Sequence, residues 1–207
     1  MSSQAPATSR TRRTQADRSA ATRHALVSAA RQLFAAHGFA EVSNDAIVAA
    51  AGVTRGALYH QFADKTELFE AVITGVESDI AKRLAAEVQA AGISDPVDAL
   101  RHAVRGWLDM CVEPEIYRIA LIDGPSVLGW KHWREVCQQY VFGMVRDLLT
   151  YGIELGRIRP QPVMSLSHVL MGASDEAALY VAESADRPQA RAEMIEILDQ
   201  LIQGLTT

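Results

Sequence analysis

The sequence predicts an all-α protein of about nine helices. Apolar residues recur at three- and four-residue spacing along most of the 207 residues. No stretch combines sustained two-residue alternation with the β-branched and aromatic residues typical of strands. Prolines at positions 96, 114, 125, 160 and 188 divide the second half of the chain into segments of helical length. A proline is tolerated at a helix start but disrupts a helix interior, so each of these positions predicts a boundary.

The first helix is predicted from about Thr22 to His37, because Leu26, Ala30 and Phe34 form one apolar stripe and Gly38 is a typical stop. Leu33 extends the same stripe. The residues before this helix are rich in Ser, Thr, Ala and Arg, a composition that favours disorder. We therefore expect residues 1–18 to form a disordered basic arm.

Two short helices follow. Ser43 is a predicted N-cap for the second helix, which should end at Gly52. Thr54 is in turn the predicted cap of a third helix that reaches residue 62. Two helices joined by a glycine-containing turn, with the first helix packed across both, form a helix-turn-helix unit.

A long fourth helix is predicted to open at Asp64 and Glu67, which have the spacing of a capping box, and to end near Gly92. Its apolar stripe recurs at four-residue spacing and consists of Leu68, Val72, Val76, Ile80, Leu84 and Val88. Between the prolines, the remaining helices are predicted at 97–112, 115–122, 128–156, 163–185 and 189–204.

Charge is distributed unevenly along the chain. Residues 1–65 carry eight Lys/Arg and four Asp/Glu, for a net charge of +4, whereas residues 66–207 carry a net charge of −9. A basic head on an acidic body favours contact between the head and a polyanion. The arginine-rich arm alone fits a solvated end as well as a nucleic-acid arm.

Composition excludes several classes of protein. A hydrophobic fraction of 49% and a charged fraction of 22% are ordinary for a globular domain, and no apolar run approaches the ~18 residues of a membrane helix. The N-terminal residues lack an apolar secretory core, so we expect a cytoplasmic, nucleoid-associated protein. Cys111 and Cys137 stand alone among aliphatic residues and are predicted to be reduced core residues.

The third predicted helix has two chemically different faces. Leu58 and Phe62 share one face and should pack inward. The opposite face presents Arg55, Gly56, Tyr59 and His60. Arginine can bind guanine or phosphate, tyrosine and histidine can donate to phosphate, and glycine allows close approach of the backbone to DNA.

The segment "HGFAEVSNDAIVAAAGVTRGALYHQFADKTELFEAVI", residues 37–73, resembles the DNA-binding domain of the TetR family of bacterial transcriptional regulators. The matching elements are the Gly–Phe after the first helix, "AIVAAAGV", "GALYHQF" and "DKTELFEAV". The resemblance is specific over residues 22–75. The sequence departs from many relatives at His60–Gln61, which leaves open whether His60 contacts a base or only a phosphate.

The resemblance implies a division into the arm of residues 1–18, a helix-turn-helix DNA-binding domain at 19–79, and a ligand-binding and dimerisation domain at 80–207. It implies as partners a palindromic double-stranded operator, a second copy of the chain and a small effector, with repression as the default. The implied DNA-contacting residues are Ser43, Thr54, Arg55, Gly56, Tyr59, His60 and Lys65.

Aromatic and methionine residues in the C-terminal half suit either an apolar effector pocket or plain core packing. A few polar groups there could make such a pocket selective, and Asp175–Glu176 could instead be a solvated edge or an interface pair. The candidate ligand-binding residues are His102, Trp107, Met110, Tyr117, Trp130, Trp133, Tyr140, His168, Met171 and Asp175.

The last two predicted helices carry wide apolar stripes. They suit either a four-helix interface with a second chain or closure of the monomer core. The candidate interface residues are Leu170, Ala173, Ala177, Tyr180, Ile195, Leu198, Leu201 and Ile202.

The sequence also bears on two other classes of function, a metal-dependent enzyme and an architectural DNA binder. A metal-dependent enzyme would need compact ligand spacing, but His168 and Asp175 are seven residues apart and no HExxH pattern, phosphate loop or nucleophilic serine turn is present. We therefore expect no catalysis, no metal and no cofactor. An architectural DNA binder without ligand control would leave the large acidic body without a role.

Overall fold

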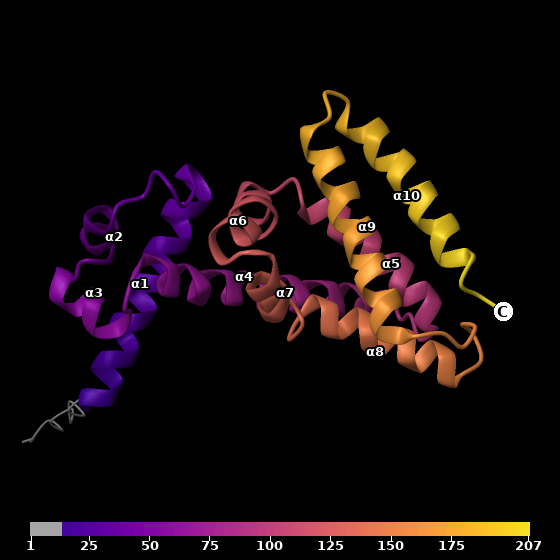
Figure 1. The fold of residues 1–207 in the computed structure, drawn as a ribbon, viewed down its shortest axis with the longest axis horizontal. Coiled ribbons are helices and arrows are strands. Elements are labelled where there is room, and N and C mark those ends of the chain that lie inside the picture. The colour runs from indigo at the N-terminus through magenta and orange to yellow at the C-terminus, as the bar shows by residue number, and fades with distance from the viewer. Residues whose placement is uncertain (1–13) are drawn as a thin grey trace, which may run out of the picture.

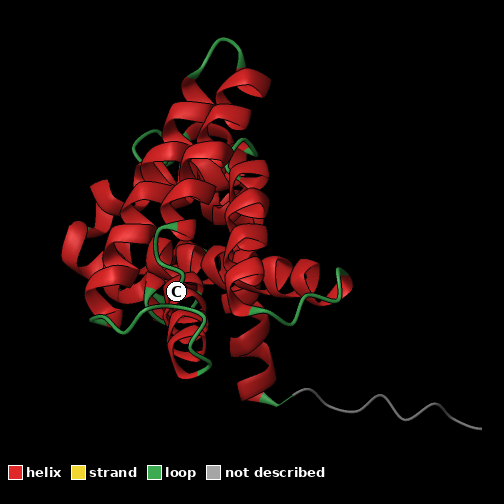
Figure 2. Cartoon of the chain, turned by 90° about the vertical axis from the view of Figure 1, so that its right-hand side faces the viewer, coloured by secondary structure: helices red, strands yellow, loops and turns green. Residues whose placement is uncertain are grey.

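The computed structural model describes residues 14–207 and has an extended, two-lobed shape (Figure 1). A small lobe of α1 (Gln15–His37), α2 (Asn44–Ala51) and α3 (Arg55–Gln61) lies at one end. Helices α5 (Pro96–Met110), α8 (Val141–Glu154), α9 (Val163–Glu183) and α10 (Arg187–Gln203) form a bundle at the other. Helix α4 (Lys65–Ala90) runs from the small lobe into the bundle. Within the described residues, helices are joined by short loops and no strand is present, which confirms the predicted all-α class (Figure 2). Ten α-helices and one π-helical segment are found there, where about nine were expected.

Helix α1, Gln15–His37, begins earlier than predicted. The hydroxyl of Thr14 accepts from the backbone N–H of Asp17, and the Asp17 carboxylate accepts from the N–H of Thr14, at 3.2 and 2.9 Å. This capping box extends the helix back over residues that were assigned to the disordered arm. The prediction of a disordered arm is therefore wrong for residues 14–18, and its remaining part, residues 1–13, lies outside the described residues.

Helices α2, Asn44–Ala51, and α3, Arg55–Gln61, form as predicted. The Ser43 hydroxyl accepts from the N–H of Ala46, and the Thr54 hydroxyl accepts from the N–H of Ala57. Gly52 closes α2 with φ of +65°, a conformation that favours glycine. The sequence predicted this turn correctly because all of its determinants are local.

Helix α4, Lys65–Ala90, is the common spine of the molecule. Its N-terminal half contributes Leu68, Phe69 and Val72 to the core beneath α1, and its C-terminal half continues through Ile80 and Leu84. All of these side chains belong to one continuous buried cluster. The expected division between residues 79 and 80 thus falls inside a helix, with no linker at that point.

The central segments are more broken than the sequence suggested. Helix α5, Pro96–Met110, is followed by a π-helical segment, Ile116–Asp123, here called η1, where an ordinary helix was expected. The single helix expected over 128–156 is instead the end of α6, Gly124–Leu128, then α7, Trp130–Cys137, and α8, Val141–Glu154.

A backbone feature accompanies each break. Gly129 has φ of +74°, a conformation that favours glycine, and it separates α6 from α7. At the joint between α7 and α8, Gly143 approaches the carbonyl of Gln138 so closely that a Cβ would lie 2.9 Å from its oxygen. The apolar periodicity continues across both breaks, so it could not reveal them.

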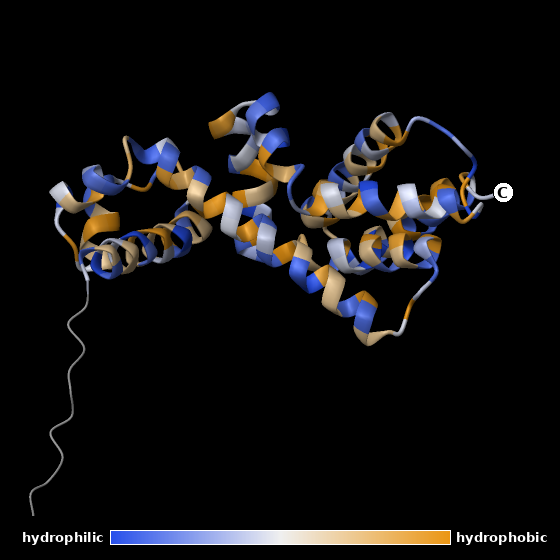
Figure 3. Cartoon of the chain, turned by 90° about the horizontal axis from the view of Figure 1, so that it is seen from below, coloured by the Kyte–Doolittle hydropathy of each residue, from blue (hydrophilic) through white to orange (hydrophobic). Residues whose placement is uncertain are grey.

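Helices α9, Val163–Glu183, and α10, Arg187–Gln203, complete the bundle. Polar and apolar residues are interspersed along every helix, as amphipathic packing requires (Figure 3). Cys111 and Cys137 are buried and unpaired with each other, as predicted. Among residues 14–207, none of the helices combines the length and the apolar character needed to cross a membrane.

Gly152 in α8 provides a stability test. A Cβ added there would lie 2.6 Å from Cδ1 of Ile158, which is fully buried. We expect Gly152→Ala to lower the free energy of unfolding by about 1–3 kcal/mol through overpacking. The matched control is Gly75→Ala in α4, where the nearest atom would be 3.9 Å away. The control should be neutral or stabilising by up to about 1 kcal/mol, because alanine favours helix. Urea denaturation measures both, and equal effects would contradict the packing argument.

Candidate functional site

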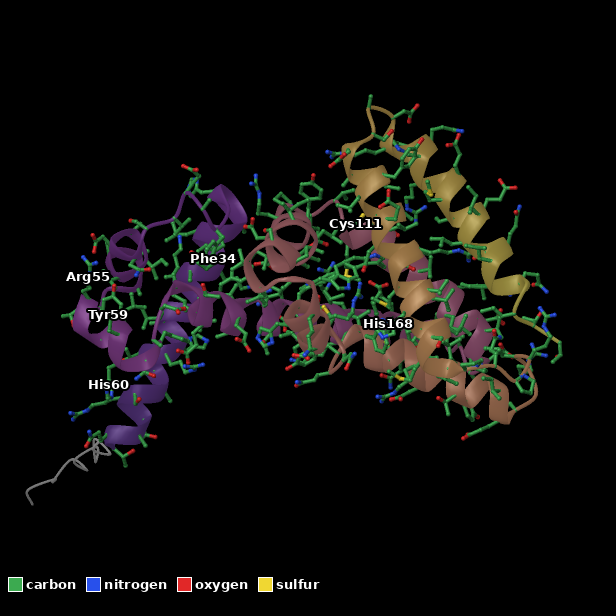
Figure 4. All side chains as sticks on the ribbon, in the orientation of Figure 1. Phe34, Arg55, Tyr59, His60, Cys111 and His168 are labelled. Carbon is green, nitrogen blue, oxygen red and sulfur yellow. The ribbon has the colours of Figure 1, made fainter. Side chains whose placement is uncertain are left out.

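Helix α3 presents the predicted polar face to solvent. Leu58 and Phe62 are each only 2% exposed and anchor the helix on the core. Arg55, Gly56, Tyr59 and His60 are all exposed. Figure 4 shows the labelled Arg55, Tyr59 and His60 side chains at the outer end of the small lobe, far from the bundle. The geometry therefore leaves this face free to contact a large partner.

The start of α2 supports this face, a role that the sequence did not reveal. The Asn44 amide donates to the Tyr59 hydroxyl at 3.3 Å, and the Arg55 guanidinium pairs with Asp45 at 3.2 Å. The nearby Arg55 guanidinium, followed by the Asn44 amide, lowers the pKa of Tyr59. These contacts orient the two longest side chains of the face. Asn44 and Asp45 were missed because their partners lie 15 and 10 residues away on another helix.

The predicted surface is flanked by Ser43, Thr54 and Lys65, and each of these side chains has hydrogen-bond partners within the protein. The hydroxyls of Ser43 and Thr54 cap α2 and α3. The Lys65 ammonium donates to the carbonyls of Phe39 and Val42 at 2.9 and 3.0 Å and lies 4.1 Å from the centre of the Phe39 ring. Lys65 therefore ties α4 to the loop before α2, and it has one N–H left for another acceptor.

The start of α1 stabilises the other end of α3. Arg23 donates to the carbonyl of Gln61 at 3.1 Å, and its guanidinium lies 4.3 Å from the centre of the Phe62 ring. The Gln61 amide in turn donates to the Ser19 hydroxyl at 2.8 Å. The early start of α1 thus positions the C-terminal end of α3.

A second candidate site is a cavity of about 50 Å³ inside the bundle. Helices α4, α5, α7, α8, α9 and α10 and the segment η1 all contribute to its wall. The wall is mostly apolar, and the indole N–H of Trp107 is fixed by the carbonyl of Ser174 at 3.2 Å. The volume is below the roughly 300–1,000 Å³ of typical ligand pockets, so the walls must move apart to admit an aromatic ring.

Four of the ten candidate ligand-binding residues line this cavity, namely Trp107, Trp133, Met171 and Asp175. The other six lie elsewhere. Met110 is core, Trp130 is 64% exposed, and Tyr117 bonds Glu183 through its hydroxyl. The exposed His168 stacks 4.8 Å from Phe142, and His102 and Tyr140 do not reach the cavity. The structure does not bring these six residues to the cavity wall, because residue type alone does not show which helix face points inward.

Sequence reasoning missed four polar residues of the cavity wall, namely Glu77, Arg134, Cys137 and Ser174. The Cys137 thiol donates to the Glu77 carboxylate at 3.4 Å, and Arg134 pairs with Asp175 at 3.3 Å. The sequence does contain a signal for the burial of Glu77. It shares a helix face with Ile73, Ile80 and Leu84, which is unusual for a carboxylate.

Burial of Glu77 predicts an unusual pH dependence. Desolvation raises its pKa from 4.5 to about 7. Between these values the folded protein keeps a proton that the unfolded chain releases, so stability falls as pH rises, by about 3 kcal/mol in total. Glu77→Gln should lose less stability between pH 5 and pH 8 than the parent in urea denaturation. The control Glu87→Gln, an exposed change on the same helix, should behave as the parent. A parental pH profile in Glu77→Gln would show that Glu77 does not cause the pH dependence of stability.

The candidate interface residues divide into two groups. Ala177, Leu198 and Ile202 are at most 3% exposed, and Leu170 lines the cavity with Leu198 and Ile202. Ala177, Leu198 and Ile202 serve the protomer core, because a buried side chain cannot contact a second chain, whereas Leu170 is partly exposed. Tyr180 and Leu201 are 48% and 49% exposed, and Ala173 and Ile195 are partly exposed.

The two sites are connected through η1. Its Ala120 and Leu121 line the cavity, and its Asp123 accepts from the backbone N–H of Phe39 at 2.7 Å. Just before η1, Glu115 accepts from Arg31 of α1, at 2.7 Å. Arg31 also pairs with Asp79 of α4 at 2.7 Å, and these carboxylates raise the pKa of its guanidinium. The cavity wall therefore contacts the small lobe directly.

No group of three or more His, Cys, Asp or Glu residues between positions 14 and 207 has the geometry of a metal site. His168 and Asp175, weighed above as metal ligands, have separate partners in Phe142 and Arg134.

Comparison with known proteins matches both lobes. Residues 97–205 match the family described as "Tetracyclin repressor-like, C-terminal domain", and residues 26–72 match "Bacterial regulatory proteins, tetR family". The transposon Tn10 TetC protein of Escherichia coli is 23% identical over 85% of this chain and 88% of its own length. The regulator AcrR of Shigella flexneri is 37% identical over 48% of this chain and 46% of its own.

Solved structures agree. A TetR-family regulator from Pectobacterium atrosepticum has a TM-score of 0.77 and 32% identity, over 94% of this chain and 98% of that protein. RolR, solved with resorcinol as ligand, has a TM-score of 0.71 and 20% identity, over 92% and 95% of the two chains, and so shows likeness of fold. The chain belongs to the TetR family of bacterial transcriptional regulators, with the DNA-binding domain at its N-terminal end.

Proposed function

We propose that this regulator is a homodimeric repressor that binds a palindromic operator and is released by a small, largely apolar, aromatic effector. The observation that carries the proposal is the double role of η1, which lines the cavity and also holds the small lobe. Relatives named as repressors, BepR of Brucella suis and AcnR of Corynebacterium efficiens, support repression over activation. Action on chromosomal DNA implies a cytoplasmic location.

We propose that α3 is the recognition helix and lies in the major groove. Arg55, Tyr59 and His60 would meet bases or phosphates, and Gly56 would allow close approach of the backbone. No atom other than the Thr54 hydroxyl, at 3.9 Å, approaches the Cβ position of Gly56, so the protein itself does not require glycine there. Ser43, Thr54 and Lys65 would contact or position the DNA backbone at the edges of the surface.

We propose that a second copy packs on the outer face of α9 and α10. One such recognition helix contacts only a few base pairs, so a two-fold dimer is needed for specificity. Val169, Tyr180, Ile197 and Leu201 are 48–67% exposed there. Gly172 and Ala173 lie on the same face of α9, and a Cβ on Gly172 would meet no atom within 4 Å. Small residues flanked by exposed apolar ones suit close helix packing.

We propose that an effector acts by widening the cavity. A ring that enters a space of about 50 Å³ must displace its walls, which include η1 and α4. Both of these elements contact the small lobe, so the displacement would change the spacing of the two recognition helices in a dimer. Resorcinol in RolR supports a small aromatic effector.

The coupling between sites is directly measurable. Small aromatics are screened by tryptophan fluorescence, since Trp107 and Trp133 line the cavity, and hits are titrated with and without operator. A coupling of about 1–3 kcal/mol would weaken operator binding about 5–150-fold, and operator would weaken effector binding by the same factor. Hits whose affinity is unaffected by operator would instead favour an architectural DNA binder.

Arg31 should carry part of this coupling. In Arg31→Met, the links from α1 to Asp79 and Glu115 are lost while the cavity wall is untouched. We expect effector affinity without operator to remain parental. The release factor by which effector weakens operator binding, about 5–150-fold in the parent, should fall at least about threefold. Arg83→Met is the matched control, because the hydrogen bonds and ion pair of Arg83 go to Glu113 and not to α1. Equal release factors in both variants would exclude the Arg31 route.

A further inference from the structure

The cavity has one polar end, built from three helices. Glu77 of α4 and Arg134 of α7 are 6% and 5% exposed, and the Asp175 side chain of α9 is 15% exposed. All three line the same cavity, whose remaining wall is mainly aliphatic and aromatic. Ionisable groups are costly in such a place unless their hydrogen bonds are satisfied. The hydrogen bonds of these groups therefore indicate what the cavity is built to hold.

Arg134 has buried N–H groups that no acceptor in the protein satisfies. Its Nη2 donates to Asp175 at 3.3 Å, whereas its Nε and Nη1 are buried and have no hydrogen-bond acceptor in the protein. The guanidinium is held in place, with Cζ 4.4 Å from the centre of the Trp133 ring and 4.8 Å from that of Trp130. Trp130 covers it from the solvent side. Two fixed nitrogen atoms whose N–H groups have no acceptor favour a ligand that brings an oxygen atom.

The indole N–H of Trp133 is not available as a second donor to a ligand. Its indole nitrogen is also without an acceptor, but a Cβ built on Gly124 would lie only 2.8 Å from that nitrogen. The N–H edge of the indole is therefore packed against the backbone of α6. Arg134 remains the donor for a ligand.

The charges at this end select against ions. Arg134 is the one cation of the cavity wall and is already paired with Asp175. Desolvation raises the pKa of Glu77 to about 7 and that of Asp175 to about 6, which shows that the site resists further negative charge. An anionic ligand would add negative charge beside these carboxylates, and a cationic ligand would compete with Arg134. A neutral ligand does neither.

Glu77 supplies the complementary group. The thiol of Cys137 satisfies one of its oxygens, at 3.4 Å, and a carboxyl group has further acceptor capacity. A hydroxyl group can accept from Arg134 and donate to Glu77 at once. A carbonyl or a bare ring can satisfy at most one of the two.

We propose that the cavity selects an uncharged, largely apolar molecule that carries a hydroxyl group, of which phenol is the smallest aromatic example. Arg134 donates to the hydroxyl oxygen and Glu77 accepts its hydrogen. The inference rests on the proposed function of the cavity as effector site and adds to it the polar chemistry of the effector.

Four single-ring probes test the inference on the full-length protein at neutral pH. They are phenol, toluene, benzoate and benzylammonium, and tryptophan emission excited at 295 nm reports their binding. We expect phenol to bind about 10- to 100-fold more tightly than toluene, the range of hydrogen bonds to charged groups. Both ions should bind more weakly than phenol.

The double variant Arg134→Met with Asp175→Asn removes the ion pair without leaving a lone buried charge. We expect the variant still to bind toluene, which shows that the cavity is folded, and its preference for phenol over toluene to fall below about threefold, since the charged donor of the hydrogen bond is gone. The control is Arg146→Met with Asp147→Asn, an exposed ion pair on α8, which should keep the parental preference.

Equal affinity for phenol and toluene, or tightest binding of benzoate or benzylammonium, would overturn the inference while leaving the cavity as a ligand site. Parental preference in the Arg134 and Asp175 double variant would also overturn it. If none of the four probes binds, both this inference and the effector cavity of the proposed function fail.

Discussion

Tyr59→Ala is expected to weaken operator binding strongly while leaving the protein folded. Tyr59 lies on the exposed face of α3, the residue is 48% exposed, and its hydroxyl accepts from the Asn44 amide. Loss of such a contact costs about 1–3 kcal/mol for each recognition helix, so a dimer with two of them should lose at least about 30-fold in affinity. Fluorescence anisotropy with a selected operator measures the loss.

Two further variants show which part of the side chain acts. Tyr59→Phe keeps the ring and removes only the hydroxyl, so it should lose an intermediate amount if the hydroxyl contacts a phosphate. Tyr151→Ala removes an equally exposed tyrosine, also 48%, from α8 and should bind as the parent does. Parental affinity in Tyr59→Ala would show that α3 does not contact the operator through this face.

Val169→Arg is expected to dissociate the dimer and to abolish operator binding with it. Val169 is 67% exposed on the outer face of α9, so a charge there leaves the protomer intact but would be buried without a partner at the proposed interface. Sedimentation velocity at micromolar concentration should show a dimeric parent and a monomeric variant. Its half-operator affinity should match that of a single DNA-binding domain.

The control for this experiment is Leu155→Arg. Leu155 is 52% exposed at the end of α8, and the same charge there should leave the dimer intact. A parent that sediments as a monomer would contradict the interface, and so would a Val169→Arg variant that remains dimeric.

Local patterns made the small lobe predictable. The hydroxyls of Ser43 and Thr54 cap the helices that they precede, and Gly52 adopts the left-handed conformation that the turn requires. Helix α1 was misjudged, although Thr14 and Asp17 already had the spacing of a capping box. The composition of the arm favours disorder, but the local hydrogen bonds of the capping box start the helix there.

The cavity could be predicted only in outline. Aromatic and methionine residues suggested an apolar space, but Glu77 and Arg134 come from helices 57 residues apart in the sequence and meet only in the fold. Trp130 and Trp133 lie only three residues apart in α7, yet Trp133 is buried and Trp130 is 64% exposed. Tertiary contacts of this kind leave no periodic pattern in a single sequence.

Selection of operator DNA by the purified full-length protein tests the central claim most directly. Fragments of bacterial genomic DNA are bound, recovered and sequenced, and the enriched sites are mapped by footprinting. We predict one enriched family of pseudo-palindromes whose half-sites lie about one helical turn, or a small multiple of it, apart, because two α3 helices of a dimer must enter major grooves on one side of the duplex. Binding that enriches no sequence over bulk DNA, or a site without two-fold symmetry, would contradict the account.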